Sequence, residues 1–573
     1  MNKNLSTNKP IKIWDLPNIT IFYDQIVKMR DGVDLLCDVY LPKEELTFST
    51  LLIRTPYNKD DVFNQGYAHP SWYVSKGYAI VCQDVRGRWE SNGEFYPFLN
   101  ECSDGHDTIN WINNQPWSNG KIGMYGFSYG GTTQMLTAIN NPNGLVAAAP
   151  GMTGSNYFND WTYNNGTLNL AFIQSWAVDL AKDEAIRMGD QKAVNKFNKY
   201  QSNPINLYSQ LPIRKTLKQE FSKYAPYLND WYDHQIYDEY WKQFSPKEHY
   251  ESMNFHGLHI AGWYDIFLKG TIENYVGLKK ASDKHQMLVI GPWYHMPWSQ
   301  YVGEVDFGND AMNNIDILQV RFFDRWLNNI ENNIEKEDPV HLFVMGINKW
   351  KTFSDWPLKK VGVQKLFLAK DQFANSLNGS GKLLKTPSNS KNIYDSYPVN
   401  PHNPVSSLGG RSCCVDTISP MGPKDQRPVE MRNDVLIYES NLLGEKITCI
   451  GEPEITLHFA CNTVTTDITA KLIDVFPSGK AINISDGILR INKTHSGKIF
   501  KINLKLSPTA NCFAKGHKIR IEIAGTNFPM NDRNTNSKVN SFSAASKDFK
   551  ISTHFIFHGS NYLSYIELPV VNL

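Results

Sequence analysis

The first quarter of the chain alternates short apolar runs with amphipathic segments. Runs of five or six residues at 49–54, 78–83, 121–125 and 145–149 are short and apolar enough for buried strands. Segments such as 132–139 are compatible with helices. Buried strands alternating with helices are typical of a mostly parallel sheet. The sequence therefore predicts an α/β domain.

The pattern changes at residue 154 and again at 252. Residues 154–251 contain long helix-compatible stretches, such as 171–188, and many Trp and Tyr residues. We interpret 154–251 as a helical insertion that caps the site, including Trp161 and Trp176. The alternative is a helical subdomain that does not contact substrate.

Strand–helix alternation resumes in residues 252–340, with apolar runs at 258–262 and 287–291. We therefore assign 1–153 together with 252–340 to one α/β domain. From 341 to 573 short alternating segments separated by turn residues dominate, which predicts an all-β sandwich.

Composition excludes several classes of function. The 573 residues include 58 basic and 57 acidic ones, for a net charge of +1, so neither a nucleic-acid-binding surface nor a polybasic membrane patch is indicated. The sequence contains no run of about 18 apolar residues, so it predicts no membrane span. The polar N-terminus lacks the apolar core of a signal peptide. We expect a cytoplasmic protein with neither nucleic-acid nor membrane partners.

The eight cysteines form no C-x-x-C pair, and no Cys/His spacing suggests zinc. Adjacent Cys413 and Cys414 are poorly placed to bridge each other, so we expect reduced thiols throughout. Nothing in the sequence requires a metal or another cofactor.

The segment Gly126-Phe-Ser128-Tyr-Gly130-Gly has the form G-x-S-x-G between a predicted strand and a predicted helix. A serine on such a sharp turn projects its hydroxyl above the sheet, and small residues are required two positions to either side. The N-terminal amides of the following helix point at an oxyanion formed there. We therefore predict Ser128 to be a nucleophile.

A serine nucleophile needs a base and a carboxylate that orients the base, each on a loop after a strand. Asp265 follows the strand at 258–262, and His295 follows the strand at 287–291. Their separation of 30 positions leaves room for one helix and one strand. The rivals fit less well: His106 precedes a helix-like run, His256 and His259 begin a strand, and Asp283 lies in a polar loop.

An oxyanion hole needs two hydrogen-bond donors. The backbone amide of Tyr129, which follows the nucleophile, is the expected first donor. The second comes from the loop at 54–59, which has no run of glycines, so the hydroxyl of Tyr57 is the natural substitute. Judged from the residues alone, a packed tyrosine is the stronger interpretation of Tyr57.

Several ordered segments together resemble the CocE/NonD (cocaine-esterase-like) hydrolases, which are related to X-Pro dipeptidyl-peptidases. The resemblance covers nearly the whole chain. The segments that carry it are Arg54-Thr-Pro-Tyr57, Asp84-Val-Arg-Gly-Arg88, 115–123, the Ser128 turn, Gly262-Trp-Tyr-Asp265, Gly291-Pro-Trp-Tyr-His295, 425–428 and 467–475.

The resemblance implies an α/β-hydrolase core, a helical cap and a C-terminal jelly-roll sandwich. It implies Ser128 as nucleophile, His295 as base, Asp265 as acid, and the Tyr57 hydroxyl and Tyr129 amide as oxyanion donors. It therefore reverses the interpretation of Tyr57 as a packed residue. The segments around Asp84, Arg86 and Asp467 are expected to hold fold and domain contacts.

Substrate specificity is less defined by the sequence. Asp265 is followed by Ile-Phe-Leu, which offers no extra carboxylate of the kind that α-amino-acid ester hydrolases use to hold an amine. Phe267 and the cap aromatics Trp161 and Trp176 favour an apolar or aromatic acyl group. An ester hydrolase acting on a small molecule is the first hypothesis.

Three alternatives stay open: an amidase or Xaa-Pro dipeptidyl-peptidase with the same triad, an acyltransferase, and a binding protein with an idle hydrolase core. An amine substrate would need a carboxylate partner, with Asp160 or Asp179 as candidates. A homodimer is also left open.

Overall fold

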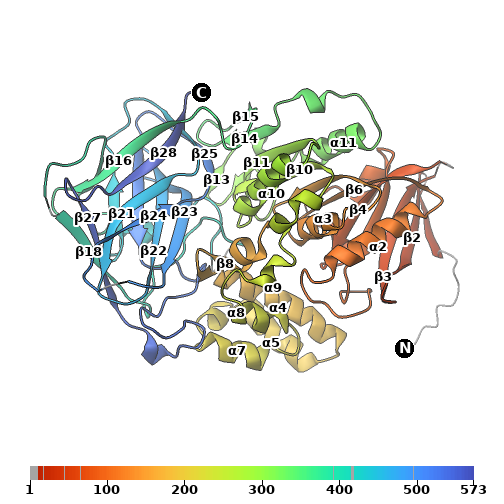
Figure 1. The fold of residues 1–573 in the computed structure, drawn as a ribbon, viewed down its shortest axis with the longest axis horizontal. Coiled ribbons are helices and arrows are strands. Elements are labelled where there is room, and N and C mark those ends of the chain that lie inside the picture. The colour runs from red at the N-terminus through yellow and green to blue at the C-terminus, as the bar shows by residue number, and fades with distance from the viewer. Residues whose placement is uncertain are drawn as a thin grey trace.

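The computed structural model describes residues 11–16, 18–43, 46–64, 66–391, 393–413, 419–494 and 496–573. Figure 1 shows an α/β region with both faces of its sheet covered, a group of helices beside it, and a β-rich region formed by the C-terminal part of the chain. This is the predicted fold class.

An eleven-stranded sheet organises the α/β region. Its strands are parallel from β5 to β14, with antiparallel pairs at both edges. In spatial order they are β1 (Ile11–Leu16), β2 (Ile19–Lys28), β3 (Asp34–Pro42), β5 (Ala79–Asp84), β4 (Phe48–Thr55), β6 (Ser118–Phe127), β7 (Leu145–Gly151), β10 (His256–Tyr264), β11 (Gln286–Tyr294), β14 (Val340–Val344) and β15 (Lys349–Phe353).

Helices cover both faces of this sheet because successive strand residues point to opposite sides. On β4, Leu52 packs in one cluster with α2 (Glu101–Asn113) and α3 (Tyr129–Ile139). Its neighbours Leu51 and Ile53 pack on the other face with α1 (Pro70–Val74) and α11 (Ile315–Trp326). Helix α10 (Leu268–Ala281) connects β10 to β11.

The helical region follows β7 in the chain and packs largely through aromatic side chains. Its cluster includes Tyr129 of α3 and Phe267 before α10, so these helices pack against the edge of the sheet where α3 and α10 begin. The elements are a π-helix (Tyr157–Thr162), a hairpin of β8 (Tyr163–Asn164) and β9 (Thr167–Leu168), α4 (Leu170–Arg187), α5 (Gln191–Ser202), α6 (Ile205–Tyr208), α7 (Ile213–Glu220), α8 (Tyr227–Asp233) and α9 (Glu239–Lys242).

The C-terminal region is a network of thirteen hydrogen-bonded strands. Its jelly-roll topology stays a prediction, as do the exact domain boundaries. The strands are β16 (Gly362–Lys370), β17 (Gly381–Leu384), β18 (Ile393–Val399), β19 (Leu436–Glu439), β20 (Ile447–Gly451), β21 (Glu454–Cys461), β22 (Thr466–Val475), β23 (Ala481–Ile491), β24 (Phe500–Lys505), β25 (Thr509–Phe513), β26 (Lys518–Ala524), β27 (Ser552–His558) and β28 (Tyr565–Val571). Short elements complete the chain: β12 (Tyr301–Val302), β13 (Val305–Asp306) and α12 (Arg427–Glu430).

Hydrogen bonds and shared packing join the β-rich region to the other two. One buried cluster contains residues of both sheets. The backbone of Met345 exchanges hydrogen bonds with Ala510 and Cys512 at 2.9 and 2.8 Å. Arg490, held by Asp467 at 2.8 Å, also donates its backbone N–H to the carbonyl of Asn165 in the β8–β9 turn. The Asp467 segment therefore holds a domain contact.

The cysteine prediction needs one correction. Cys413 is disulfide-bonded, whereas Cys37, Cys82, Cys102, Cys449, Cys461 and Cys512 are free. The expectation of reduced thiols throughout the chain is therefore wrong.

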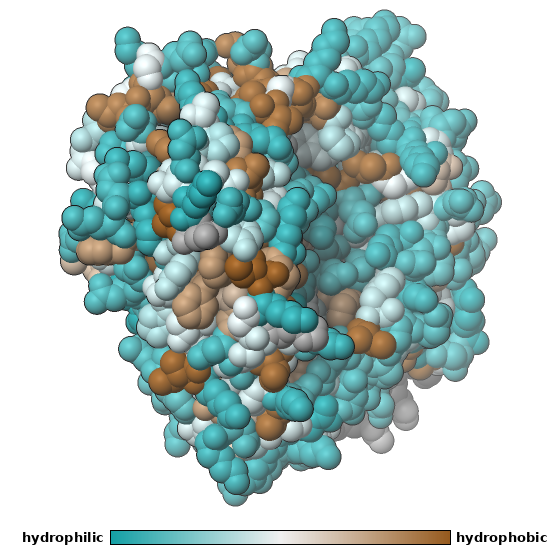
Figure 2. Space-filling view, turned by 60° about the vertical axis from the view of Figure 1, so that its left-hand side comes forward, coloured by the Kyte–Doolittle hydropathy of each residue, from teal (hydrophilic) through white to brown (hydrophobic). Residues whose placement is uncertain are grey.

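The molecular surface is predominantly hydrophilic on the face in Figure 2, with apolar residues in scattered groups. Within the described ranges, no helix has both the length and the apolar character that a membrane span needs.

Candidate active site

Ser128 stands at the junction of β6 and α3 in a backbone conformation that few residues adopt. Its φ and ψ are 58° and −125°, outside the regions favoured by L-amino acids. Residues other than glycine tolerate such strain only where the surrounding structure enforces it. Here the Ser128 N–H donates to Gly151 of β7, and its carbonyl accepts from Gly131 and Thr132. The strand–turn–helix predicted around this serine is confirmed.

The glycines around Ser128 are required at different places than the motif suggests. Gly126 has φ of 135°, and a Cβ there would lie 3.2 Å from the backbone of Gly130. At Gly131, a Cβ would lie 2.7 Å from the carbonyl oxygen of Gly151. At Gly130 the nearest atom to a Cβ is 3.9 Å away, which leaves room for a methyl group. The second tight position is therefore Gly131, three residues after the serine.

Three side chains form a hydrogen-bonded chain at the carboxyl ends of parallel strands. Ser128 Oγ lies 2.9 Å from His295 Nε2, and His295 Nδ1 lies 2.8 Å from Asp265 Oδ1. Asp265 and His295 directly follow β10 and β11, which are adjacent in the sheet. Both side chains are buried. With Nδ1–H donating to Asp265, Nε2 is an acceptor that faces the serine hydroxyl.

The rival residues take other positions. His259 is buried and pairs with Gln286 at 2.8 Å, and His256 stacks on Trp326 with ring centres 3.6 Å apart. His106 lies within α2 and Asp283 in the turn after α10. None of these four has a hydrogen bond or ring contact with Ser128 among the described residues.

Tyr129 offers its backbone amide at the start of α3, where no preceding turn of helix can accept it. Its side chain is anchored below the turn: the hydroxyl donates to Glu101 at 3.0 Å and accepts from the Phe98 N–H at 2.9 Å. Glu101 in turn pairs with Arg54 at 2.8 Å, both side chains being buried. This support holds the start of α3 in place, and no local pattern in the sequence points to Glu101.

Tyr57 lies across the site on the loop after β4. Trp176 Nε1 of α4 donates to the Tyr57 hydroxyl at 2.9 Å. Burial raises the pKa of Tyr57 to about 12, although hydrogen bonds with Trp176 and Ser128 oppose that rise. The phenol is therefore protonated at neutral pH and has a proton to donate.

Arg88 fixes the Tyr57 loop to the helical region. The carbonyl of Pro56 accepts from Arg88 Nε at 3.1 Å. The same guanidinium donates to the carbonyl of Leu180 at 3.2 Å and to Asp183 at 2.6 Å, both on α4. Arg88 is 1% exposed, so its bonds to the two carbonyls are shielded from water. It lies in a segment that the sequence analysis singled out, but only as a fold contact.

The three aromatic residues predicted to bind substrate gather around the triad. Phe267 packs edge-on against His295, with ring centres 5.1 Å apart, and stacks on Trp161 at 4.6 Å. Trp161 meets Trp176 edge-on at 5.5 Å. Trp161 Nε1 is buried without a hydrogen-bond partner in the described part of the chain. The helical region therefore borders the Ser128–His295–Asp265 group.

Of the two cap carboxylates considered as amine partners, Asp160 is occupied. Its Oδ2 accepts from the N–H groups of Ser155 and Asn156 at 3.2 and 3.1 Å and from the Ser155 hydroxyl at 2.8 Å. Asp179 is instead exposed on the wall of a small cavity. The described residues contain no group of three or more His, Cys, Asp or Glu side chains arranged to hold a metal.

Two family models match this chain. The model of the X-Pro dipeptidyl-peptidase (S15 family) matches residues 31–297, and that of the X-Pro dipeptidyl-peptidase C-terminal non-catalytic domain matches residues 332–567. The cocaine esterase of Rhodococcus sp. (strain MB1 Bresler) is 32% identical, covering 97% of this chain and 99% of the relative. A Xaa-Pro dipeptidyl-peptidase of Lactobacillus helveticus is 23% identical over 58% of this chain and 41% of that protein.

Solved structures share the whole architecture. An α-amino acid ester hydrolase superposes with a TM-score of 0.79 at 23% identity, over 100% of both chains. A CocE/NonD family hydrolase from Staphylococcus aureus superposes with a TM-score of 0.69 at 17% identity, covering 96% of this chain and 94% of that one. At these identities the likeness supports the fold.

Proposed function

The chain belongs to the cocaine-esterase-like (CocE/NonD) branch of the S15 hydrolases and is a carboxylesterase-type serine hydrolase. We propose that it cleaves esters through an acyl-enzyme on Ser128. The observation that carries this mechanism is the Ser128–His295–Asp265 hydrogen-bonded chain, with the Tyr57 hydroxyl hydrogen-bonded to Ser128 from the loop after β4.

In the proposed first step, His295 Nε2 takes the proton from Ser128 Oγ as the oxygen attacks the ester carbonyl carbon. Asp265 holds the imidazole and stabilises its positive charge. The carbonyl oxygen becomes an oxyanion that accepts hydrogen bonds from the Tyr57 hydroxyl and the Tyr129 N–H. The tetrahedral intermediate then collapses, and His295 gives its proton to the leaving alcohol.

Deacylation repeats these steps with water as the nucleophile. His295 removes a proton from the water as its oxygen attacks the acyl carbon, and returns that proton to Ser128 Oγ when the ester bond to the enzyme breaks. The stacked rings of Trp161 and Phe267, with Trp176 beside them, favour an apolar or aromatic acyl group through burial and ring contacts.

An amide or Xaa-Pro dipeptide substrate is the second candidate, since one family model carries that name. Against it, Asp160 is already occupied and the three residues after Asp265 carry no charge, so of the carboxylates considered only Asp179 is left to hold a peptide amine.

The proposal is tested by comparing hydrolysis by the wild type with hydrolysis by Ser128→Ala. The substrates are p-nitrophenyl acetate, p-nitrophenyl butyrate, phenyl benzoate and an Ala-Pro anilide. We expect ester turnover, fastest with the benzoate, that falls by about 10⁴-fold or more in the variant. Anilide turnover without ester preference would move the assignment to the peptidase. Ester turnover that survives in Ser128→Ala would reject the mechanism.

A further inference from the structure

The buried side-chain amide of Gln134 joins three segments that meet at Ser128. Gln134 lies in the second turn of α3 and is fully buried. Its Nε2 donates to the carbonyls of Gly126 and Gly130, both at 2.9 Å. Its Oε1 accepts from the Ala149 N–H at 3.1 Å. One side chain therefore bonds the strand before Ser128, the helix after it and the neighbouring strand β7.

A glutamine is the side chain that suits all three bonds. Its amide has two N–H groups for the two carbonyls and one oxygen for the N–H of Ala149. A glutamate at 134 would present acceptors to the carbonyls, and an asparagine is one methylene shorter. Hydrogen bonds in a buried, low-dielectric surrounding are strengthened because no water competes for the partners. These bonds therefore restrict the movement of residues 126 and 130.

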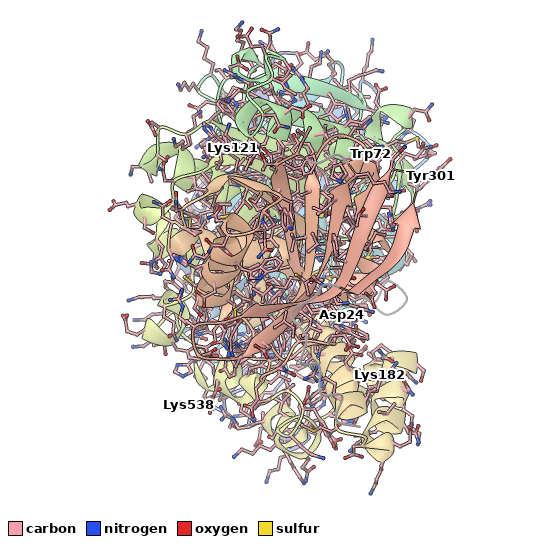
Figure 3. All side chains as sticks on the ribbon, turned by 90° about the vertical axis from the view of Figure 1, so that its right-hand side faces the viewer. Asp24, Trp72, Lys121, Lys182, Tyr301 and Lys538 are labelled. Carbon is pink, nitrogen blue, oxygen red and sulfur yellow. The ribbon has the colours of Figure 1, made fainter. Side chains whose placement is uncertain are left out.

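The same bonds reach the strained backbone of Ser128. Its φ of 58° persists only where the surrounding structure enforces it. Its N–H donates to the carbonyl of Gly151 at 3.0 Å, two residues beyond Ala149 on β7. Figure 3 shows the sheet from the side of β2 and β3, with Lys121 of β6 labelled. Gln134 joins β6 to β7 next to the bond made by the Ser128 N–H.

The Gly130 carbonyl is also reached by Thr133. Thr133 Oγ1 lies 3.0 Å from that carbonyl oxygen and 3.2 Å from the carbonyl oxygen of Arg54, at the end of β4. Within the described ranges, the Thr133 side chain has no hydrogen bond to β6 or β7. Gln134 therefore supplies the side-chain bonds between the first turn of α3 and those two strands.

We propose that Gln134 is a positioning residue, which directs the Tyr129 N–H at the oxyanion and Ser128 Oγ at the ester carbonyl carbon. The inference rests on the proposed acyl-enzyme mechanism. Gln134 touches neither the substrate nor the reacting atoms, and acts by holding the backbone on both sides of the Ser128–Tyr129 peptide. Because an oxyanion hydrogen bond strengthens as negative charge develops, a misdirected N–H lowers kcat and leaves KM nearly unchanged.

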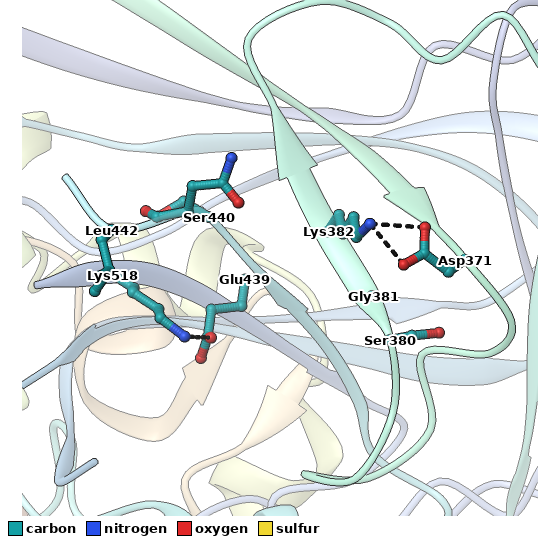
Figure 4. A pocket seen from close by; sticks show the side chains of 9 residues that line it. Asp371, Ser380, Gly381, Lys382, Glu439, Ser440, Leu442 and Lys518 are labelled. Carbon is teal, nitrogen blue, oxygen red and sulfur yellow. Dashed lines mark hydrogen bonds and ion pairs between the residues drawn. The ribbon is translucent and has the colours of Figure 1, made fainter. Parts of the chain in front are cut away.

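A cavity of about 630 Å³ in the β-rich region has no comparable link to the reaction. Its lysines are paired with its acids, Lys382 with Asp371 and Lys518 with Glu439 (Figure 4). The described residues that line it all lie between 371 and 518, and none belongs to the elements around Ser128. A charged ligand entering there would have to break these pairs.

Gln134→Met tests the positioning role, because methionine keeps the length of the side chain and removes the amide. We expect kcat for phenyl benzoate to fall by about 30-fold, with KM within about twofold of the wild type. Gln286→Met is the matched control. Gln286 is also buried, donates to the Phe255 carbonyl at 2.9 Å and pairs with His259, but it begins β11 at the end remote from His295. It should lose thermal stability and keep kcat.

Gln134→Glu keeps the shape of the side chain and provides a second variant. Its carboxyl has at most one O–H in place of two N–H groups, so at least one carbonyl loses its partner. We expect a kcat between those of the wild type and Gln134→Met. A kcat within about twofold of the wild type in both variants, a change confined to KM, or an equal loss of kcat in Gln286→Met would overturn the positioning role.

Phosphonylation separates this inference from ester hydrolysis. With ethyl 4-nitrophenyl methylphosphonate, Ser128 Oγ bonds to phosphorus, 4-nitrophenolate leaves with the electron pair of its P–O bond, and His295 takes the serine proton. We expect labelling of Ser128, followed by mass spectrometry, to be about 30-fold slower in Gln134→Met and unchanged in Gln286→Met.

The two proposals then fail in different ways. Labelling that is slowed in Gln134→Met, without ester turnover by the wild type, would contradict ester hydrolysis alone. Ester turnover that depends on Ser128, with equal labelling of the wild type and Gln134→Met, would contradict the positioning role alone.

Discussion

The two sides of Ser128 are built from different kinds of structure. On one side, Asp265 and His295 follow two neighbouring parallel strands, and a single hydrogen bond joins each to the next residue of the triad. On the other side, Tyr57 lies on a loop that is held by two residues. Trp176 belongs to the cap helix α4 and bonds Tyr57, and Arg88 bonds both the loop and α4.

This difference separates two sources of precision. The proposed acid–base side is positioned by sheet topology, because adjacent parallel strands end at the same edge. The proposed oxyanion side is positioned by contacts between regions far apart in the chain: residues 57 and 176 are 119 positions apart. Damage to the sheet side should therefore change the chemistry itself, whereas damage to the cap should weaken the oxyanion side first.

The largest effect is expected for Asp265→Asn. The asparagine keeps the shape but holds the imidazole in the wrong tautomer, so kcat should fall by about 10⁴-fold. Steady-state kinetics with phenyl benzoate measure this. Ser128→Ala/Asp265→Asn should be no worse than Ser128→Ala, because the triad acts as a unit. A tenfold loss or less in Asp265→Asn would show that the carboxylate does not orient the base.

Tyr57→Phe comes next. Loss of one oxyanion donor should lower kcat by about 100-fold, with KM nearly unchanged, since the hydrogen bond strengthens as the negative charge develops. Trp176→Phe removes the indole N–H that donates to the Tyr57 hydroxyl and also reduces the ring that packs on Trp161, and we expect a loss of about tenfold. If Trp176→Phe is neutral in wild type and in Tyr57→Phe alike, the cap does not position this donor.

Arg88→Lys tests the attachment of the loop to α4. A lysine cannot reach Pro56, Leu180 and Asp183 together, because it lacks the planar fork of arginine. We expect kcat to fall by about tenfold and the midpoint of thermal unfolding to fall with it. Arg214→Lys is the control, because Arg214 lies in the same helical region but bonds Tyr232 and Asp233 instead of the Tyr57 loop. The double variant Arg88→Lys/Tyr57→Phe should lose less kcat than the product of the two single losses, because both residues act on the same oxyanion donor.

The smallest effect concerns Asp84, which accepts the Lys59 N–H at 2.7 Å and so anchors the far end of the Tyr57 loop. Burial raises the pKa of Asp84 to about 7, above the value of about 3.9 for an unfolded chain. A raised folded-state pKa means that this contribution to stability is present below pH 4 and is lost as pH rises through 7.

Thermal unfolding of the wild type and Asp84→Asn at pH 5 and pH 8 measures that contribution. The midpoint of the wild type, relative to the variant, should fall by about 2 °C or more between the two pH values. An unchanged difference would mean that Asp84 titrates alike in the folded and unfolded chain.

The sheet and the turn at Ser128 could be read from local pattern. The apolar runs at 258–262 and 287–291 lie within β10 and β11, and the helix-compatible stretch 171–188 nearly coincides with α4. The motif requires a small residue at position 130, but the structure leaves no space for a Cβ at Gly131 instead. The reason is that the carbonyl of Gly151 in β7 packs against α3 at Gly131.

The sequence by itself determined the alternating α/β pattern, the order Ser128, Asp265, His295 and the end of a strand as the place of each, because short-range periodicity and strand order encode these. Tertiary structure alone decided that Arg88 and Trp176 hold the Tyr57 loop, that Glu101 supports Tyr129, that Asp160 is occupied and that Asp179 is open to its cavity. Those outcomes depend on which distant side chains contact each other and which are excluded from water. A local sequence pattern predicts neither the contacts nor the burial.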